Sequence, residues 1–389
     1  MESDTKRIYL DNAATSWPKP EAVYRAVNAY QQDSGVAVGR GATRRGAELQ
    51  RIVDRCRERA ARLLGAESAE RVIFTFNGTD GLNLALHGLL AGGDHVVTSV
   101  MEHNSVLRPL RTLRERNGVE VSYAPADHTG LVDLEALRRS VTPRTKLVAL
   151  IHASNVTGTI QPVGEAARIA HDAGALFLLD AAQTAGHIPI NVQDLAVDLL
   201  ACSGHKGLMG PLGTGLVYIR PGVEELLQSL RQGGTGSQSE DDRQPEKLPD
   251  KYESGNHNAL GIVGLDASLG WIEEQEVAAL QAHEAGHIAR LLAGLEEIPG
   301  VQSLGPTGDN ARTGVVSMTI EGFDPQDAAA ILDESFGIEV RAGLHCAPRA
   351  HEALGSLERG GTVRVSVGAF TTEDDVNAVL SAFRDLSMT

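Results

Sequence analysis

Two apolar runs in the stretch 175–206 each end in polar residues that could do chemistry. These are Asp180 and Gln183 after the first run, and Ser203, His205 and Lys206 after the second. Apolar runs of this length, bounded by glycine, predict buried strands. Because ligands bind outside the carboxyl ends of strands in an open α/β sheet, we expect both groups to face one crevice.

A lysine and a carboxylate at such positions fit the chemistry of pyridoxal phosphate. Lys206 would form a Schiff base with the cofactor aldehyde, and Asp180 would pair with the protonated ring nitrogen, which makes the ring an electron sink. Ser203 and His205 flank the lysine and could hold the phosphate. The spacing alone leaves a second interpretation open, in which Asp180 caps a turn and Lys206 is a solvated side chain.

A third reactive residue, Cys346, stands between glycine and proline in the segment 341–348, which predicts a loop. His345 is its neighbour, and Arg341 and Arg349 are close in sequence. Such an environment could favour the thiolate form. The alternative is a buried structural cysteine, because free cysteine often behaves as a small apolar residue.

Arg364 is a charge within an otherwise apolar predicted strand, 362–366, and therefore needs a partner. A guanidinium binds a carboxylate through two parallel hydrogen bonds, so the α-carboxylate of an amino acid is a natural ligand. A structural ion pair is the alternative.

The segment Asn77 to Asp80 follows a predicted strand, 71–76, and opens a helix. Glycine and a hydroxyl residue, Gly78 and Thr79, at a helix start offer free N–H groups and a positive dipole, which suit a phosphate. An ordinary N-cap remains the alternative. Asp80 would repel an anion, so we expect it to serve the helix dipole.

His103 follows the predicted strand 95–100 and could be no more than a structural hydrogen-bonding residue. Asn104 or Ser105 is the expected N-cap of the helix that runs to Arg116.

Strands and helices alternate through the first two thirds of the chain, which predicts an α/β fold with a mostly parallel sheet covered on both faces. A long helical region, 261–295, and an α+β lobe follow. Irregular segments are expected at 35–46, with Arg40, Arg44 and Arg45, and at 233–256, an exposed loop. The remaining predicted strands are 119–124, 145–151, 213–220, 313–320 and 338–342, and the remaining helices 18–30, 46–64, 133–140, 162–173, 325–334 and 372–386.

Length and composition bound the class of protein. A chain of 389 residues is longer than one hydrophobic core usually supports, so two domains are expected. The net charge of −16 argues against nucleic acid or an anionic membrane as the main partner. We expect no secretory signal and no membrane span. Three cysteines, Cys56, Cys202 and Cys346, favour a reducing, cytoplasmic location, and Cys56 is expected on the apolar face of its helix.

The segments LLDAAQTAGHIPI and CSGHKGLMGPLGTGLVYIR resemble sequences of the class V aminotransferase family, and within it those of the cysteine desulfurases and selenocysteine lyases. The resemblance extends from YLDNAATSWPKP to TVRVSVGAFTTEDDV. It implies the type I fold of pyridoxal-phosphate-dependent transferases. The large domain would span 18–262, and the small domain 1–17 with 263–389, which carries the cysteine loop.

The resemblance also implies roles for individual residues. His103 would stack on the cofactor ring and take part in proton transfer, and Asn155 would contact the phenolic oxygen or the substrate carboxylate. Asn256 stands where relatives have a hydroxyl residue that reaches the partner subunit's phosphate. The predicted cofactor-binding residues are Gly78, Thr79, His103, Asn155, Asp180, Gln183, Ser203, His205, Lys206 and Asn256. Asn155 and Arg364 are the predicted substrate-binding residues, Lys206, Cys346 and His103 the catalytic ones, and no metal site is predicted.

The implied activity converts L-cysteine to L-alanine. Lys206 would remove the Cα proton, and the Cys346 thiolate would take the sulfur as a persulfide for an acceptor protein or thiol. A homodimer, and a role in iron–sulfur cluster assembly, also follow from the resemblance alone. The alternatives are a selenocysteine lyase, another class V lyase or transferase, and a cofactor-binding regulator without catalysis.

Overall fold

The computed structural model describes residues 7–39, 43–237, 240–307 and 312–388, so Arg40 lies outside the described residues. Its largest described sheet has seven strands, of which β8 alone runs in the direction opposite to the other six. In spatial order they are β2 (Val72–Thr75), β8 (Gly215–Ile219), β7 (Leu199–Ser203), β6 (Leu176–Asp180), β5 (Thr145–Ile151), β3 (His95–Ser99) and β4 (Glu120–Ala124). The predicted, mostly parallel sheet is confirmed.

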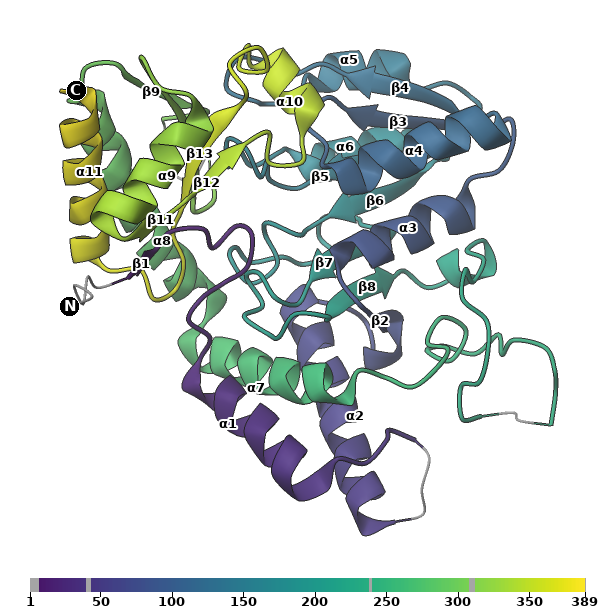
Figure 1. Cartoon of the computed structure of the whole chain (residues 1–389). Helices are drawn as coiled ribbons and strands as arrows, with labels where there is room; N and C mark the ends of the chain where they lie inside the picture. Colours follow the sequence, from purple (N-terminus) through teal and green to yellow (C-terminus); the bar gives the residue numbers. More distant parts are fainter. Residues whose placement is uncertain (1–6, 40–42, 238–239, 308–311, 389) are drawn as a thin grey trace.

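Helices cover both faces of this sheet (Figure 1). Successive side chains of a strand point to opposite faces. Phe177 and Leu179 of β6 therefore join one core cluster and Leu178 joins the other. The first cluster packs against α2 (Arg44–Leu64), α5 (Leu134–Ser140), α6 (Val163–Asp172) and α7 (Ala259–Gln275), and the second against α3 (Gly78–Leu89) and α4 (Asn104–Asn117).

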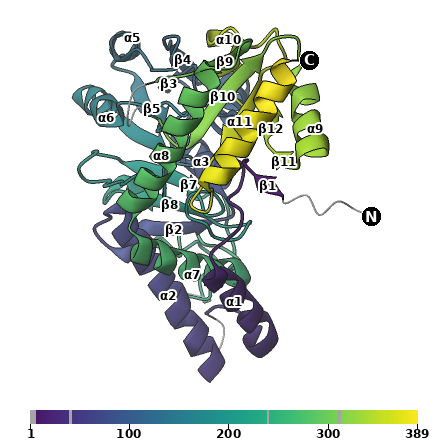
Figure 2. The same ribbon diagram turned by 90° about the vertical axis from the view of Figure 1, so that its left-hand side faces the viewer.

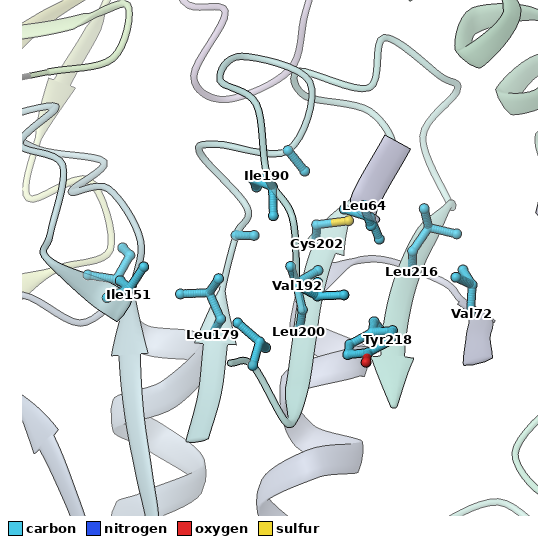
Figure 3. Packing of buried hydrophobic residues seen from close by; sticks show 14 of the residues in the cluster. Leu64, Val72, Ile151, Leu179, Ile190, Val192, Leu200, Cys202, Leu216 and Tyr218 are labelled. Carbon is cyan, nitrogen blue, oxygen red and sulfur yellow. The ribbon is translucent and has the colours of Figure 1, made fainter. Parts of the chain in front are cut away.

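The strands around the future site are buried on both sides, which explains why their sequences are continuous apolar runs. Figure 3 shows part of the first cluster, where the sulfur of Cys202 lies among apolar side chains that include Leu64 and Leu216. Burial raises the pKa of the Cys202 thiol to about 12 and also raises the pKa of Cys56. Both thiols are inert core residues, as expected for Cys56.

A smaller antiparallel sheet is built from the C-terminal part of the chain and is backed by helices (Figure 2). Its spatial order is β12 (Arg341–Gly343), β13 (Thr362–Ser366), β10 (Val315–Ile320) and β9 (Val301–Leu304), with α8 (Val277–Glu296), α9 (Pro325–Phe336) and α11 (Glu373–Ser387) against it. The N-terminal β1 (Ile8–Tyr9) pairs in parallel with β11 (Ile338–Glu339). The residue boundaries of the two domains stay a prediction.

The helical region predicted from 261 to 295 is two helices rather than one. Glu276 has φ of +64°, which ends α7 and lets α8 leave in a new direction. The core of α7 lies with the large sheet, whereas that of α8 lies with the small one.

Two segments that were expected to be irregular, 35–46 and 233–256, contain residues that are helical or buried. Helix α2 begins at Arg44 because Thr43 caps it, its hydroxyl accepting the N–H of Gly46. The loop 233–256 is not exposed at its end, where Lys251, Tyr252 and Glu253 are buried. Glu253 is held there by a two-fold ion pair with Arg57 of α2, at 2.7 and 2.8 Å.

Short elements escaped the sequence analysis, among them β9 and α10 (Pro348–Ala353). The strand predicted at 338–342 is two strands, β11 and β12, which belong to different sheets. The described part of the chain also contains α1 (Glu21–Ala29), a π-helical turn (Tyr30–Ser34) and short 3₁₀ turns at Ala69–Arg71 and Val223–Glu225. No described helix is both long and apolar enough to span a bilayer.

Candidate active site

One cavity of about 330 Å³ opens at the carboxyl ends of the central strands. Asp180 ends β6 and Lys206 follows β7, and these strands are parallel neighbours, so both side chains arrive at the same edge of the sheet. Eight residues predicted from the sequence line this cavity: Gly78, Thr79, His103, Asn155, Asp180, Gln183, Ser203 and Lys206. Leu82, Ser105, Ile151 and Ala182 line it too and were not predicted as site residues.

Burial sets the charge balance between Lys206 and Asp180. The protein around Lys206 lowers the pKa of its amine to about 8, chiefly by desolvation, with Asp180 acting in the opposite direction. Desolvation likewise raises the pKa of Asp180, although its Oδ1 accepts the N–H of Ala182 at 2.9 Å. A lysine that loses its proton readily can act as a nucleophile or a base. Lys206 lines the cavity and is only partly exposed, so it is not a fully solvated side chain, whereas Asp180 does accept the N–H of a turn, as the alternative interpretation expected.

The N-terminus of α3 forms one end of the cavity. The N–H of Gly78 donates to Ser203 Oγ at 3.2 Å, and a Cβ at position 78 would come within 2.8 Å of that oxygen, so glycine is required. Asn77 caps the helix by accepting the N–H of Asp80. The carboxylate of Asp80 accepts the N–H of Phe76 at 3.0 Å. It also forms an ion pair of 3.2 Å with Arg231, which lies just before the segment 233–256.

Ser105 is a site residue that sequence reasoning missed. Its hydroxyl lies 2.7 Å from Thr79 Oγ1 and 2.8 Å from His103 Nδ1, which links the starts of α3 and α4. The three hydroxyls of Thr79, Ser105 and Ser203 thus stand at a helix N-terminus, a setting that favours an anion. Hydroxyl residues next to predicted helix starts were the available signal, but their meeting depends on how two helices are placed.

His103 caps α4 itself, so the expectation that Asn104 or Ser105 would do so is wrong. Its Nδ1 accepts the N–H of Ser105 at 3.1 Å. Burial, aided by the nearby cations Lys206 and Arg341, lowers the pKa of His103 to about 3. The ring is therefore neutral, and because Nδ1 accepts, the proton resides on Nε2.

Asn155 connects the cavity to two other predicted residues. Its side-chain Nδ2 donates to the carbonyl of His345 at 2.6 Å, and its own carbonyl accepts from Nη1 of Arg364 at 3.1 Å. Its Oδ1 is buried with no partner. An unpaired buried oxygen is costly unless a ligand supplies a donor, so this atom suits a bound molecule.

Arg364 is almost completely buried and does not line the cavity itself, but it is hydrogen-bonded to Asn155, which does. Its Nη2 is 2.5 Å from Oδ1 of Asp11, which is the structural ion pair considered as the alternative. Its Nε is buried without a partner, so the N–H of this atom is free to bind a ligand. Its role toward a substrate carboxylate stays a prediction.

Cys346 lies in the turn between β12 and α10, and its side chain is exposed. The predicted loop is confirmed, and a buried structural cysteine is excluded. Nη2 of Arg341 lies 3.7 Å from the sulfur. Arg349 does not contact the thiol but stacks over the ring of Tyr123, at 3.8 Å from its centre. The carbonyl of Cys346 accepts the N–H of Asn104 at 2.7 Å, which ties the turn to the start of α4 beside His103.

Two predicted cofactor residues lie outside the cavity lining. The carbonyl of His205 accepts from Ser16 and Lys19, and its ring Nδ1 is buried without a partner. Asn256 is exposed and lines a separate surface cavity of about 440 Å³. Gln183, although at the main cavity, gives its Nε2 to the carbonyl of Ala13.

Comparison with known proteins agrees with this geometry. The class-V aminotransferase family matches residues 8–379. A probable cysteine desulfurase of Methanothermobacter thermautotrophicus is 37% identical over 98% of this chain and 94% of that protein. A cysteine desulfurase of Haloferax volcanii is 32% identical over 98% and 89%.

Solved structures give the same result. The apo structure of a cysteine desulfurase from Thermococcus onnurineus superposes with a TM-score of 0.92 at 35% identity, covering 98% of this chain and 95% of that one. The cysteine desulfurase CsdA of Escherichia coli, in an S-sulfonic acid form, gives a TM-score of 0.87 at 29% identity, with 98% and 94% covered. The chain therefore belongs to the class-V aminotransferase family, in its cysteine desulfurase group.

Proposed function

We propose that this protein is a pyridoxal-phosphate-dependent cysteine desulfurase, which converts L-cysteine to L-alanine and takes the sulfur onto Cys346 as a persulfide. The observation that carries the proposal is an exposed thiol on a turn whose backbone is hydrogen-bonded to Asn155, a residue that lines the cavity with Lys206 and Asp180. The relatives named as cysteine desulfurases support the same activity.

The groups around the cavity fit pyridoxal phosphate. Lys206 offers an amine of lowered pKa for the aldehyde, and Asp180 a buried carboxylate for the ring nitrogen. The hydroxyls at the N-terminus of α3 suit the phosphate. Asn155 Oδ1 is unpaired and can accept a hydrogen bond from a bound molecule. When bound there, the cofactor supplies an electron sink for the substrate's Cα.

Each residue then has a defined task. Lys206 removes the Cα proton, and the neutral ring of His103 takes part in proton transfer. Arg364 binds the α-carboxylate. The Cys346 thiolate attacks the substrate sulfur: an S–S bond forms, the Cβ–S bond breaks, and its electron pair stays on carbon, which takes a proton and becomes the methyl group of alanine.

The persulfide on Cys346 is a reversible cap, so an acceptor protein or small thiol must remove the outer sulfur. Iron–sulfur cluster assembly is the role we propose for that sulfur. Because the described cysteines are all free and the reaction needs a reduced thiol, we place the protein in the cytoplasm.

A homodimer completes the proposal. Asn256 is exposed and does not line the cavity of its own chain. This position suits a residue that donates a hydrogen bond to the cofactor phosphate of the partner subunit.

Three variants test the function. Cys346→Ala should keep the visible absorbance of the lysine-bound cofactor yet lose alanine production from cysteine. Lys206→Ala should lose both. Cys56→Ala, which removes a buried thiol far from any proposed step, is the control and should keep both. Unchanged turnover in Cys346→Ala would refute the sulfur-transfer role, and turnover in Lys206→Ala would refute the cofactor assignment.

A selenocysteine assay separates the desulfurase from a lyase. The assay compares kcat/KM for alanine formation from cysteine and from selenocysteine in the parent protein. A much higher value for selenocysteine would make selenocysteine the substrate, and sulfur transfer to Cys346 would then be a secondary activity.

A further inference from the structure

A buried pair of imidazoles lies directly behind the turn that carries Cys346. His345 and His351 are 2% and 0% exposed, and their ring centres are 5.5 Å apart. Nε2 of His345 lies 2.9 Å from Thr362 Oγ1, and Nδ1 of His351 lies 2.8 Å from Ser356 Oγ. The proposed reaction uses neither ring.

The turn itself has an unusual backbone. His345 has φ of +48° and Cys346 has φ of +60°, so two successive residues with side chains adopt the left-handed conformation. That region is disfavoured for residues other than glycine and persists only where the surroundings enforce it. The turn therefore needs contacts that outweigh its local cost.

Three contacts to distant parts of the chain hold the turn, in addition to its own bond, in which the N–H of Ala347 donates to the carbonyl of Leu344 at 2.8 Å. Asn155 donates to the carbonyl of His345, and the N–H of Asn104 donates to the carbonyl of Cys346. Both fix backbone oxygens. The third contact fixes a side chain: the His345 ring is docked on Thr362, a fully buried residue of β13.

We propose that His345 is a positioning residue, whose ring, docked on Thr362, holds the left-handed turn so that the Cys346 thiol stays where the sulfur of bound cysteine can be attacked. The proposal rests on the proposed function and adds to it a residue that acts through Cys346 rather than on the substrate.

The electrostatics favour positioning over proton transfer. Burial lowers the pKa of His345 to about 2, so the ring stays neutral at any pH at which the protein works. Its Nε2 is already bonded to Thr362, and its other nitrogen, Nδ1, is buried. A ring in this state is not suited to exchange protons with the exposed thiol.

The test removes the hydroxyl and leaves the histidine in place. Thr362→Val keeps the shape and the strand preference of the side chain but removes the hydroxyl that lies 2.9 Å from Nε2. Ser356→Ala is the matched control, because it removes the equivalent hydroxyl from the neighbouring His351, which does not belong to the turn. Thr362→Ser restores the hydroxyl and serves as the rescue.

Turnover is the first readout. A misplacement of about 1 Å can cost about 100-fold in rate, so Thr362→Val should lower kcat for alanine formation by about 10- to 100-fold, with KM changed less than about twofold. Ser356→Ala and Thr362→Ser should stay close to the parent protein. Alkylation of Cys346 by iodoacetamide should be no slower in Thr362→Val, because the thiol stays exposed.

The second readout does not depend on activity. Amide hydrogen exchange in a peptide covering residues 344–350 should be faster in Thr362→Val than in Ser356→Ala. Equal exchange and equal kcat in these two variants would overturn the proposal. A parent protein that makes no alanine from cysteine would instead refute the proposed function, and the exchange comparison would still decide whether His345 holds the turn.

Discussion

Replacing Arg364 by lysine should weaken the use of cysteine without unfolding the protein. The arginine is buried, with Nη2 on Asp11 and Nη1 on the carbonyl of Asn155. A lysine keeps a positive charge opposite Asp11, so it avoids an unpaired, partly buried carboxylate, whose cost would obscure the measurement.

The size of the effect follows from the unpaired Nε of Arg364. Nε of Arg364 is buried and unpaired, so the α-carboxylate of the substrate would gain one hydrogen bond to a charged group from that atom. Such a bond is worth about 1.5–3 kcal/mol. Since about 1.4 kcal/mol corresponds to a factor of ten, kcat/KM should fall about 10- to 150-fold.

The assay is alanine formation as a function of cysteine concentration. The carboxylate is bound equally before and during the reaction, so most of the loss should be a higher KM with kcat little changed. Arg359→Lys, an exposed arginine of the same lobe, is the control and should behave as the parent protein. A folded Arg364→Lys variant whose kcat/KM stays within about threefold of the parent would refute the carboxylate role.

Three further outcomes are expected. Because burial lowers the pKa of Lys206 to about 8, the rate at which the cofactor-free protein binds pyridoxal phosphate should rise with pH and level off above about pH 8. Visible absorbance measures this rate, and a rise centred near pH 10 would contradict the expectation. Asp180→Asn should retain the cofactor but lower kcat about 10- to 150-fold, since a charge-assisted bond to the ring nitrogen is lost, and unchanged kcat would exclude that bond. Glu253→Gln leaves Arg57 buried without its charged partner and should lower the free energy of unfolding by about 3–5 kcal/mol in a urea titration. The control is Glu48→Gln, in the exposed pair with Arg44, which should change the free energy of unfolding by less than about 1 kcal/mol.

The positions of Asp180 and Lys206 could be predicted because the signal is local. Each follows its own apolar strand, and the rule that parallel strands end at a shared edge brings the two together. The contact between Asn155 and His345 could not be predicted in this way, because it joins residues 190 positions apart that follow strands of two different sheets. The pairing of Arg364 with Asp11, 353 positions away, has the same origin.

Other differences come from backbone conformation rather than distance. Glu276 breaks the long helix with a positive φ, and glutamate gives no signal for such a break. His103 caps α4 through its ring, although asparagine and serine next to it are the residue types preferred at that position. In both places the surrounding structure overrides the local preference.

The cysteine turn shows why these long-range contacts matter for the chemistry. Cys346 belongs to the chain segment between β12 and α10, yet its carbonyl is bonded to Asn104 and its neighbour's to Asn155, both at the carboxyl edge of the large sheet. The thiol is therefore positioned by both sheets at once. A shift of the small sheet against the large one would have to break these two bonds before it moved the sulfur relative to Lys206. The short turn thus places the thiol by fixed contacts, and an acceptor of the sulfur must approach a thiol that is exposed but anchored rather than one that travels on a long loop.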